Sequence, residues 1–360
     1  MGSEFSPVPK AVLSPRLPPV SRIAFGSLTV SAMQRNLPPD EAAAVMAYAF
    51  DSGINFVDTA QYYANYPLIR AALRRAKDPD SVLVSSKTYA WNRELALEAV
   101  DEARRELDRD VIDVFLLHEQ ESADTLRGHR EALDTLFDLR ERGIVRAVGA
   151  STHHVALIRG LLEFADAGIE ADVCHPLYNM AGIGIADGGE REMASALAEL
   201  KARGVGIFAM KALGGGHLSV TAEEALRFAL SKPFIDAVAV GMQSFAEVDA
   251  NLRLLREGSF DDGDRKKLLL TERKLHVEEY CEGCGACVRR CASGALRLVP
   301  ADGHENGSAC DLAAEFAGSE GISPRPEDAG PKFRAEPDDG KCVRCGYCTK
   351  VCPVFALKIY

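Results

Sequence analysis

Eight of the ten cysteines of this chain lie near its C-terminal end, in two copies of the pattern C-x2-C-x2-C-x3-C. The cysteines of the two copies are Cys281, Cys284, Cys287 and Cys291, and then Cys342, Cys345, Cys348 and Cys352. The repeat extends beyond the cysteines, because Ala295-Leu296 matches Ala356-Leu357 at the same offset. Such a duplicated segment predicts two equivalent half-modules.

The spacing of these cysteines suits the ligands of two 4Fe-4S clusters. Zinc is the chemical alternative, because C-x2-C pairs also form zinc sites, but a tetrahedral zinc usually takes two separated pairs. Here three cysteines of each copy fall close together, and Pro353 follows the last cysteine of the second copy. The pattern therefore favours clusters over zinc.

The cysteine-rich region resembles the bacterial two-cluster ferredoxin module, in which the fourth cysteine of each run binds the other cluster. The resemblance implies one cluster on Cys281, Cys284, Cys287 and Cys352, and a second on Cys342, Cys345, Cys348 and Cys291. Ala292 stands where the first run usually carries proline, which loosens the turn without removing a ligand. The resemblance implies a small α+β ferredoxin-like domain, which we place at residues 273–360.

An acidic insertion rich in Gly and Pro separates the two runs at about residues 300–340. Its composition predicts a solvated loop, or alternatively a docking surface for a redox protein partner.

The 360-residue chain as a whole has an ordinary globular composition, with 47% hydrophobic and 26% charged residues. No apolar run approaches the roughly 18 residues needed to span a membrane. The net charge of −11 argues against nucleic acid or an anionic membrane surface as a partner. The lack of a secretory signal, together with thiolates that must stay reduced, predicts a cytoplasmic protein. Residues 1–14 are interpreted as a cloning remnant and an N-terminal arm.

Between about residues 20 and 255 an amphipathic helical stretch, a glycine and a short apolar strand recur. The clearest junctions lie at Gly53, Gly143, Gly168 and Gly204. Glycine suits the left-handed position that ends a helix, and Val/Ile-rich runs suit strands buried on both faces. With the strands expected at 22–28, 82–87, 111–117 and 237–240, the count is eight. This alternation, without a Gly-rich dinucleotide fingerprint, predicts a (β/α)8 TIM barrel at residues 15–272 rather than a doubly wound sheet.

Functional residues of such a barrel collect at the C-terminal ends of its strands. Asp58, Lys87 and His118 each close one of three successive expected strands, and Tyr63 follows Asp58 in the loop over the same face. Any one of them alone could be a solvated charge at the rim. Three successive strands that end on Asp, Lys and His indicate a site.

Asp58-Thr59-Ala60-x-x-Tyr63, with Lys87 and His118, is similar to the catalytic tetrad of the aldo-keto reductase superfamily. The resemblance covers most of residues 20–255 and implies NAD(P)H-linked carbonyl reduction or the reverse alcohol oxidation. It implies that Tyr63 supplies the proton and that Lys87 favours the phenolate. Asp58 would hold Lys87 in place, and His118 would donate a hydrogen bond to the carbonyl oxygen.

The same resemblance implies a nucleotide site, with several departures from the family pattern. The residues are Ser151, His175, Met210, Gln243, Ser244, Glu247 and Asn251. His175 stands near a Gln that holds the nicotinamide carboxamide, and Met210 replaces an aromatic residue that stacks on the ring. Gln243 stands where a Lys or Arg commonly binds the 2′-phosphate. The cofactor is therefore expected to be NADP or NAD, with the choice open.

Two functional hypotheses follow. The first is an iron-sulfur oxidoreductase that acts on a small carbonyl or alcohol, with clusters that either exchange electrons with the barrel or have a structural role. The alternative is an electron-transfer protein whose barrel is a docking scaffold with degenerate nucleotide chemistry.

Overall fold

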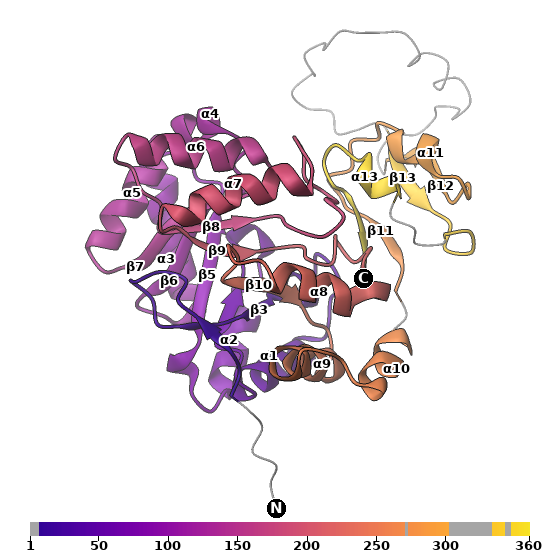
Figure 1. Ribbon diagram of the computed structural model, residues 1–360, viewed down its shortest axis with the longest axis horizontal. Helices are drawn as coiled ribbons and strands as arrows, with labels where there is room; N and C mark the ends of the chain where they lie inside the picture. Colours follow the sequence, from indigo (N-terminus) through magenta and orange to yellow (C-terminus); the bar gives the residue numbers. More distant parts are fainter. Residues whose placement is uncertain (1–6, 271–272, 302–332, 343–346) are drawn as a thin grey trace, which may run out of the picture. The chain divides into compact units, whose positions relative to one another are not determined.

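The computed structural model describes residues 7–270, 273–301, 333–342 and 347–360 (Figure 1). The chain forms two compact units. The first comprises Met1–Gly214 and Leu218–Thr271, and the second comprises Gly215–His217 and Glu272–Tyr360. The short segment Gly215–His217 thus belongs to the second unit, although the residues on either side of it belong to the first. Cys345 and most of the acidic insertion lie outside the described residues.

Eight parallel strands of the first unit close into a barrel, in the order β10-β3-β4-β5-β6-β7-β8-β9. They are β3 (Ile23–Gly26), β4 (Phe56–Asp58), β5 (Leu83–Thr88), β6 (Ile112–Leu117), β7 (Val145–Thr152), β8 (Val173–Pro176), β9 (Gly206–Ala209) and β10 (Ala237–Gly241). Nearly all of their residues are buried, as parallel strands covered on both faces require. The predicted (β/α)8 barrel is confirmed.

Helices lie around these strands (Figure 1). The α-helices are α1 (Pro39–Asp51), α2 (Tyr66–Arg75), α3 (Arg93–Leu107), α4 (Ala123–Gly128), α5 (Arg130–Glu141), α6 (Val155–Asp166), α7 (Glu190–Ala202), α8 (Ala222–Leu230), α9 (Phe245–Glu257) and α10 (Asp262–Leu270). Short 3-10 helices are η1 (Ser27–Val30), η2 (Gln61–Tyr63), η3 (Pro79–Ser81) and η4 (Ser219–Thr221). None of the helices in the described ranges is long and apolar enough to cross a membrane.

The glycines between helices and strands have the expected role at most junctions. Gly53 and Gly204 adopt φ values of 111° and 89°, in the region that side chains rarely occupy. The expectation at Gly168 is corrected in one respect, because strand β8 begins at Val173 rather than at Ile169. The amide of Ile169 instead donates to the carbonyl of Phe164 and closes the end of α6.

The N-terminal segment contributes to the barrel interior. A short antiparallel hairpin, β1 (Lys10–Ala11) and β2 (Val20–Ser21), brackets Leu13 and Leu17. Both leucines pack in the interior cluster with side chains such as Phe56 and Phe208. The Leu13 carbonyl crosses so close to Gly206 that a Cβ atom there would lie 1.7 Å from its oxygen. Part of the barrel interior is therefore filled by a segment that precedes the first barrel strand.

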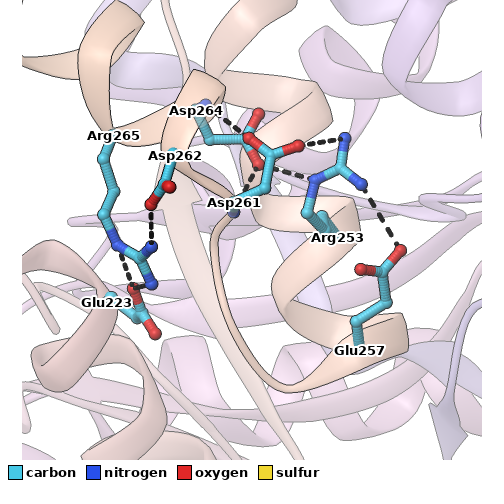
Figure 2. Close-up of polar contacts among 7 residues, drawn as sticks. All are labelled: Glu223, Arg253, Glu257, Asp261, Asp262, Asp264 and Arg265. Carbon is cyan, nitrogen blue, oxygen red and sulfur yellow. Dashed lines mark hydrogen bonds and ion pairs between the residues drawn. The ribbon is translucent and has the colours of Figure 1, made fainter.

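An ion-pair network joins α8, α9 and α10 (Figure 2). Arg253 of α9 lies 2.7 Å from a carboxylate oxygen of Asp264 and also contacts Asp261 and Glu257. Arg265 of α10 bridges Glu223 of α8 and Asp262. Within this network the carboxylate of Asp264 is nearly buried, so its pairing is the one with the larger energetic consequence.

The second unit consists of two interlocked halves. Its elements are β11 (Leu275–Val277), α11 (Ala286–Arg290), β12 (Leu296–Pro300), β13 (Phe333–Pro337), α13 (Tyr347–Lys350) and β14 (Leu357–Ile359). β11 pairs with β14, and β12 pairs with β13, both antiparallel. Each two-stranded sheet therefore takes one strand from each copy of the sequence repeat.

Candidate active site and metal centre

Asp58 and Lys87 form a buried ion pair at the C-terminal ends of the neighbouring strands β4 and β5. The Lys87 ammonium lies 2.7 Å and 2.9 Å from the two carboxylate oxygens of Asp58 and 2.5 Å from the carbonyl oxygen of Thr59. These three contacts give each N–H of the ammonium an acceptor. The pair is thus fixed in position by both strands.

The burial of this pair shapes the ionisation of both groups. Burial alone would raise the pKa of Asp58, but the Lys87 charge and a contact with His175 outweigh it and hold that pKa below its usual value. Burial lowers the pKa of Lys87, while Asp58 opposes the change. The result is an ionised carboxylate beside an ammonium that is less strongly solvated than in water.

Tyr63 lies in η2, half-buried, next to this pair. The Lys87 Nζ atom is 5.2 Å from the centroid of the Tyr63 ring. The His118 ring lies 5.8 Å from the Tyr63 ring, centroid to centroid, at an interplanar angle of 73°. The structure therefore brings Asp58, Tyr63, Lys87 and His118 together at one edge of the barrel.

His118 follows β6 and is held by its backbone, whose amide donates to the carbonyl of Thr88. Burial, assisted by the Lys87 charge, lowers the pKa of His118 to about 3, so the ring is neutral at pH 7. Its Nδ1 atom is buried without a hydrogen-bond partner among the residues that the structure describes. Because an unpaired N–H is costly to bury, the proton is assigned to Nε2. The ring then presents a neutral N–H donor.

Of the residues that the resemblance assigns to a nucleotide, Ser151 and Met210 lie at strand ends. Ser151 is buried in β7, and its hydroxyl accepts a hydrogen bond from the amide of Glu119 at 2.8 Å. Met210 follows β9 and is nearly buried. Both thus lie near the edge that carries the Asp58–Lys87 pair, as strand ends of one parallel barrel must.

His175 lies inside the barrel on β8 and makes contacts that the sequence did not predict. Its Nδ1 atom is 2.6 Å from the carbonyl oxygen of Phe208, and its ring stacks on the Phe208 ring at 3.9 Å. Its Nε2 atom is 3.5 Å from a carboxylate oxygen of Asp58. The structure therefore places His175 against the Asp58–Lys87 pair, with a side chain only 1% exposed.

The four remaining nucleotide candidates lie together where α9 begins. Ser244 is the N-cap residue, and its hydroxyl accepts from the amide of Glu247 at 3.3 Å. The Glu247 carboxylate accepts from the amide of Gln243 at 2.8 Å. Asn251 lies on the same helix and is buried. A helix N-terminus favours an anionic group, but here the Glu247 carboxylate and the Ser244 hydroxyl already accept from the amides of Gln243 and Glu247.

Four side chains near His118 are not among the predicted site residues. Tyr89, which follows β5, stacks on the His118 ring at 4.5 Å and donates from its hydroxyl to Glu119 at 2.5 Å. Glu119 also lies 3.7 Å from His153, whose Nε2 atom is 2.7 Å from Lys211 Nζ. All four follow the C-terminal ends of barrel strands, and this position in the sequence could have identified them as site candidates.

One cavity of the second unit is lined by cysteines from both halves: Cys281, Cys284, Cys287 and Cys352. This is the set that the ferredoxin resemblance assigns to one cluster, and thiolates are the donors such a cluster takes. Gly283 adopts φ 65°, and a Cβ atom there would lie 2.1 Å from the Phe333 carbonyl oxygen, so the turn between two of these cysteines needs glycine. Among the described residues no group of three or more Cys, His, Asp or Glu side chains is placed to hold a single metal ion. The fit of these residues to a 4Fe-4S cluster therefore rests on the cavity that the four cysteines share and on their thiolate donors.

The last cysteines of the two copies have equivalent surroundings. The amide of Ala295 donates to Cys291 Sγ, and the amide of Ala356 donates to Cys352 Sγ, both at 3.2 Å. Such bonds favour the thiolate form that a cluster requires. Cys342 and Cys348 pack in the same core, while Cys345 lies outside the described residues.

Comparisons with known families match both parts of the chain. The model of the "Aldo/keto reductase family" matches residues 22–224, and that of the "4Fe-4S dicluster domain" matches residues 280–356.

Curated relatives match the barrel. A 2,5-diketo-D-gluconic acid reductase B of Corynebacterium sp. is 34% identical over 161 residues, which cover 41% of this chain and 54% of the relative. An L-galactose dehydrogenase of Arabidopsis thaliana is 23% identical over 66% of this chain and 85% of the relative. A 6-dehydroglucose reductase of Novosphingobium aromaticivorans is 29% identical over 56% of this chain and 67% of the relative. The chain thus spans only about half of the reductase of Corynebacterium.

Solved structures support the fold. The holo form of an aldo-keto reductase from Bacillus halodurans aligns with a TM-score of 0.60 at 18% identity, over 73% of this chain and 95% of that one. An aldo/keto reductase from Brucella melitensis aligns with a TM-score of 0.55 at 16% identity, over 72% and 98%.

Proposed function

The chain belongs to the aldo/keto reductase family and carries a C-terminal 4Fe-4S dicluster domain, and we propose that it is an oxidoreductase that reduces a small carbonyl compound with NAD(P)H or runs the reverse alcohol oxidation. The observation that carries the proposal is the meeting of Asp58, Tyr63, Lys87 and His118 at one edge of the barrel. A reduced nicotinamide would supply a hydride there. The side chains would supply the proton and the hydrogen bond to the carbonyl oxygen.

Tyr63 is the proton donor in this proposal. A carbonyl that accepts a hydride becomes an alkoxide and needs a proton, and a phenol with a usual pKa near 10 gives one up only with help. The Lys87 ammonium, 5.2 Å from the Tyr63 ring centroid, stabilises the phenolate that remains. Asp58 keeps that ammonium charged and oriented through two short contacts.

His118 polarises the carbonyl. A neutral ring with its proton on Nε2 donates one hydrogen bond to the carbonyl oxygen, and this bond strengthens as negative charge develops there. Burial, which keeps the pKa of His118 near 3, ensures that the ring neither carries a charge nor competes with Tyr63 as the acid between pH 5 and 8.

The expected nucleotide contacts are Ser151, His175, Met210, Gln243, Ser244, Glu247 and Asn251, of which the last four lie on or just before α9 with the Glu247 carboxylate among them. The contacts of Ser151 with Glu119 and of His175 with Phe208 favour weak binding, and thereby a second candidate function: an electron-transfer protein with a degenerate nucleotide site. Titration with NADPH and NADH, followed by fluorescence, separates the two candidates, because the second predicts no saturable binding of either nucleotide.

Three relatives have names that refer to sugar-derived compounds, and we extend the proposal to carbonyl compounds of that class. A screen of aldoses, ketoaldonic acids and simple aldehydes, with NADPH oxidation followed at 340 nm, tests the extension. Turnover of simple aldehydes alone would contradict it.

The two clusters are proposed to be held by the eight repeat cysteines and to exchange electrons with a redox protein partner in the cytoplasm, where thiolates stay reduced. Hydride transfer moves two electrons together, whereas one cubane normally takes one, so both clusters would be needed to match a nucleotide. Anaerobic addition of NAD(P)H should bleach the cluster absorbance if the barrel and clusters exchange electrons. Unchanged absorbance would exclude exchange between the barrel and the clusters and leave exchange with the partner protein or a structural role.

Tyr63→Phe is the decisive variant for the proposed chemistry. It should lower turnover by about 100-fold or more, because it removes the general acid, while the nucleotide dissociation constant changes little. Tyr62→Phe is the matched control, since the neighbouring Tyr62 is exposed and lies outside the proposed tetrad. Equal turnover of the two variants would mean that the tetrad does not carry the reaction.

A further inference from the structure

The Tyr89 ring, which is 43% exposed, lies against the His118 ring. The two rings stack with centroids 4.5 Å apart and planes 23° apart. The Tyr62 ring meets Tyr89 edge-on at 5.9 Å. An aromatic ring stacked on an imidazole restricts the imidazole to rotations within its own plane. The Tyr89 ring therefore bears directly on where the His118 Nε2 atom points.

The orientation of Tyr89 is itself fixed by an ionised carboxylate. Its hydroxyl donates to Glu119 at 2.5 Å, a distance typical of a charge-assisted bond. Burial would raise the pKa of Glu119, but His153, Lys211 and other neighbouring groups outweigh it and hold that pKa at about 2. Glu119 thus accepts from Tyr89 as an anion across the physiological pH range.

The loops that build this contact are held in unusual backbone conformations. Glu119 and Lys211 adopt φ values of 47° and 57°, in the left-handed region that costs a non-glycine residue free energy. His153 connects them, because its Nε2 atom lies 2.7 Å from Lys211 Nζ and 3.7 Å from Glu119. Four loops, which follow β5, β6, β7 and β9, therefore converge on the carboxylate that orients Tyr89.

We propose that Tyr89 is a positioning residue that holds the His118 ring in the plane from which it polarises the substrate carbonyl, and that Glu119 locks Tyr89 in that role. The inference rests on the proposed function, since it assigns a contact to the same reaction. It adds a residue outside the tetrad: the stacked ring restricts His118, and the hydroxyl bond restricts the stacked ring. No bond is made or broken in this role.

The test compares Tyr89→Leu, which removes the stack, with Tyr89→Phe, which keeps the ring and removes only the hydroxyl. Tyr89→Leu should lower kcat by about 10-fold to 100-fold, the usual cost of a misplaced catalytic group, with the nucleotide dissociation constant unchanged. Tyr89→Phe should also lower kcat, but by less than half as much on a logarithmic scale, because it keeps the stacked ring. Tyr62→Leu removes only the edge-on contact to Tyr89 and leaves the Tyr89–His118 stack in place, so it should lower kcat less than Tyr89→Leu does.

A spectroscopic measurement tests the same contact without turnover. In full-length protein labelled with nitrogen-15 histidine, the His118 signals are identified by their loss in His118→Gln. Their ring protons should carry an upfield ring-current shift in the wild type and in Tyr89→Phe, and lose it in Tyr89→Leu. Unmoved His118 signals in Tyr89→Leu would overturn the inference. So would a rise in the KM for the carbonyl with an unchanged kcat, which would make Tyr89 a substrate contact.

The two proposals fail in distinguishable ways. If the wild-type protein turns over no carbonyl compound with either nucleotide, the proposed function fails. The contact between Tyr89 and His118 is then tested by the His118 signals alone. If these signals do not change in Tyr89→Leu, the proposed contact is refuted as well.

Discussion

Gly216 offers the sharpest test of how the second unit is assembled, through the variant Gly216→Ala. Gly216 adopts φ 92°, and an added Cβ atom would lie 1.8 Å from the carbonyl oxygen of Ile359. No side chain fits at that distance, so the two backbones must separate. The neighbouring hydrogen bond from the Ile359 amide to the Gly215 carbonyl, 2.8 Å long, would then break.

The expected magnitude has two parts. A left-handed backbone at alanine costs about 1–2 kcal/mol, and the lost hydrogen bond adds about 1 kcal/mol. A combined loss of about 2–3 kcal/mol accelerates hydrogen exchange at Leu357–Ile359 by about 30-fold to 150-fold if exchange there occurs through opening of this sheet.

Gly294→Ala is the matched control for strain alone. Gly294 belongs to the same unit and adopts φ 63°, but an added Cβ atom meets nothing within 4 Å. Hydrogen–deuterium exchange with mass spectrometry on peptides that cover 353–360 provides the measurement. Equal protection of Leu357–Ile359 in the two variants would refute the reasoning, because it would mean that Gly216 does not hold the strand.

Three further expectations follow from the contacts described above. Anaerobically purified protein should contain about eight iron and eight sulfide per chain, and Cys352→Ser about half of that, whereas zinc without sulfide would contradict the cluster assignment. Gln243→Arg should shift the ratio of dissociation constants toward NADPH by about 10-fold, since it supplies the missing charge for a 2′-phosphate; a wild type that already prefers NADPH strongly would show another basic residue at that position. Asp264→Asn should lower the free energy of unfolding by about 1–3 kcal/mol in denaturant titrations, because the Asp264 side chain is only 5% exposed. Asp262→Asn should lower it by less than about 0.5 kcal/mol, because that side chain is 92% exposed. Equal losses would mean that burial does not set the strength of the network.

The barrel could be predicted because its signals are local. Each glycine that ends a helix, and each apolar run that follows it, lies within a few residues along the chain, and a parallel barrel repeats that unit. The start of β8 was placed too early because Ile169 is apolar like a strand residue, while its amide closes the preceding helix. Only the hydrogen bond distinguishes the two roles.

The sequence predicted that Asp58, Tyr63, Lys87 and His118 lie close together, because they lie at or just after neighbouring strand ends. It did not predict the residues that surround them. The approach of His175 to Asp58 joins β8 with β4, which are not neighbours in the barrel, so no pairing pattern in the sequence predicts it. The link from Glu119 through His153 to Lys211 depends on left-handed backbone at two non-glycine residues. Such conformations are imposed by the tertiary structure and leave little trace in residue type.

The passage of Leu13 across Gly206 has a consequence for the order in which the chain folds. Leu13 emerges from the ribosome long before Gly206, yet its carbonyl lies against that glycine and its side chain in the interior cluster. The segment that carries Leu13 and Leu17 must therefore wait, with its leucines exposed, until the seventh barrel strand has been synthesised. Closure of the barrel is then a late and non-local event, of the kind that makes folding slow and leaves the nascent chain dependent on protection from aggregation.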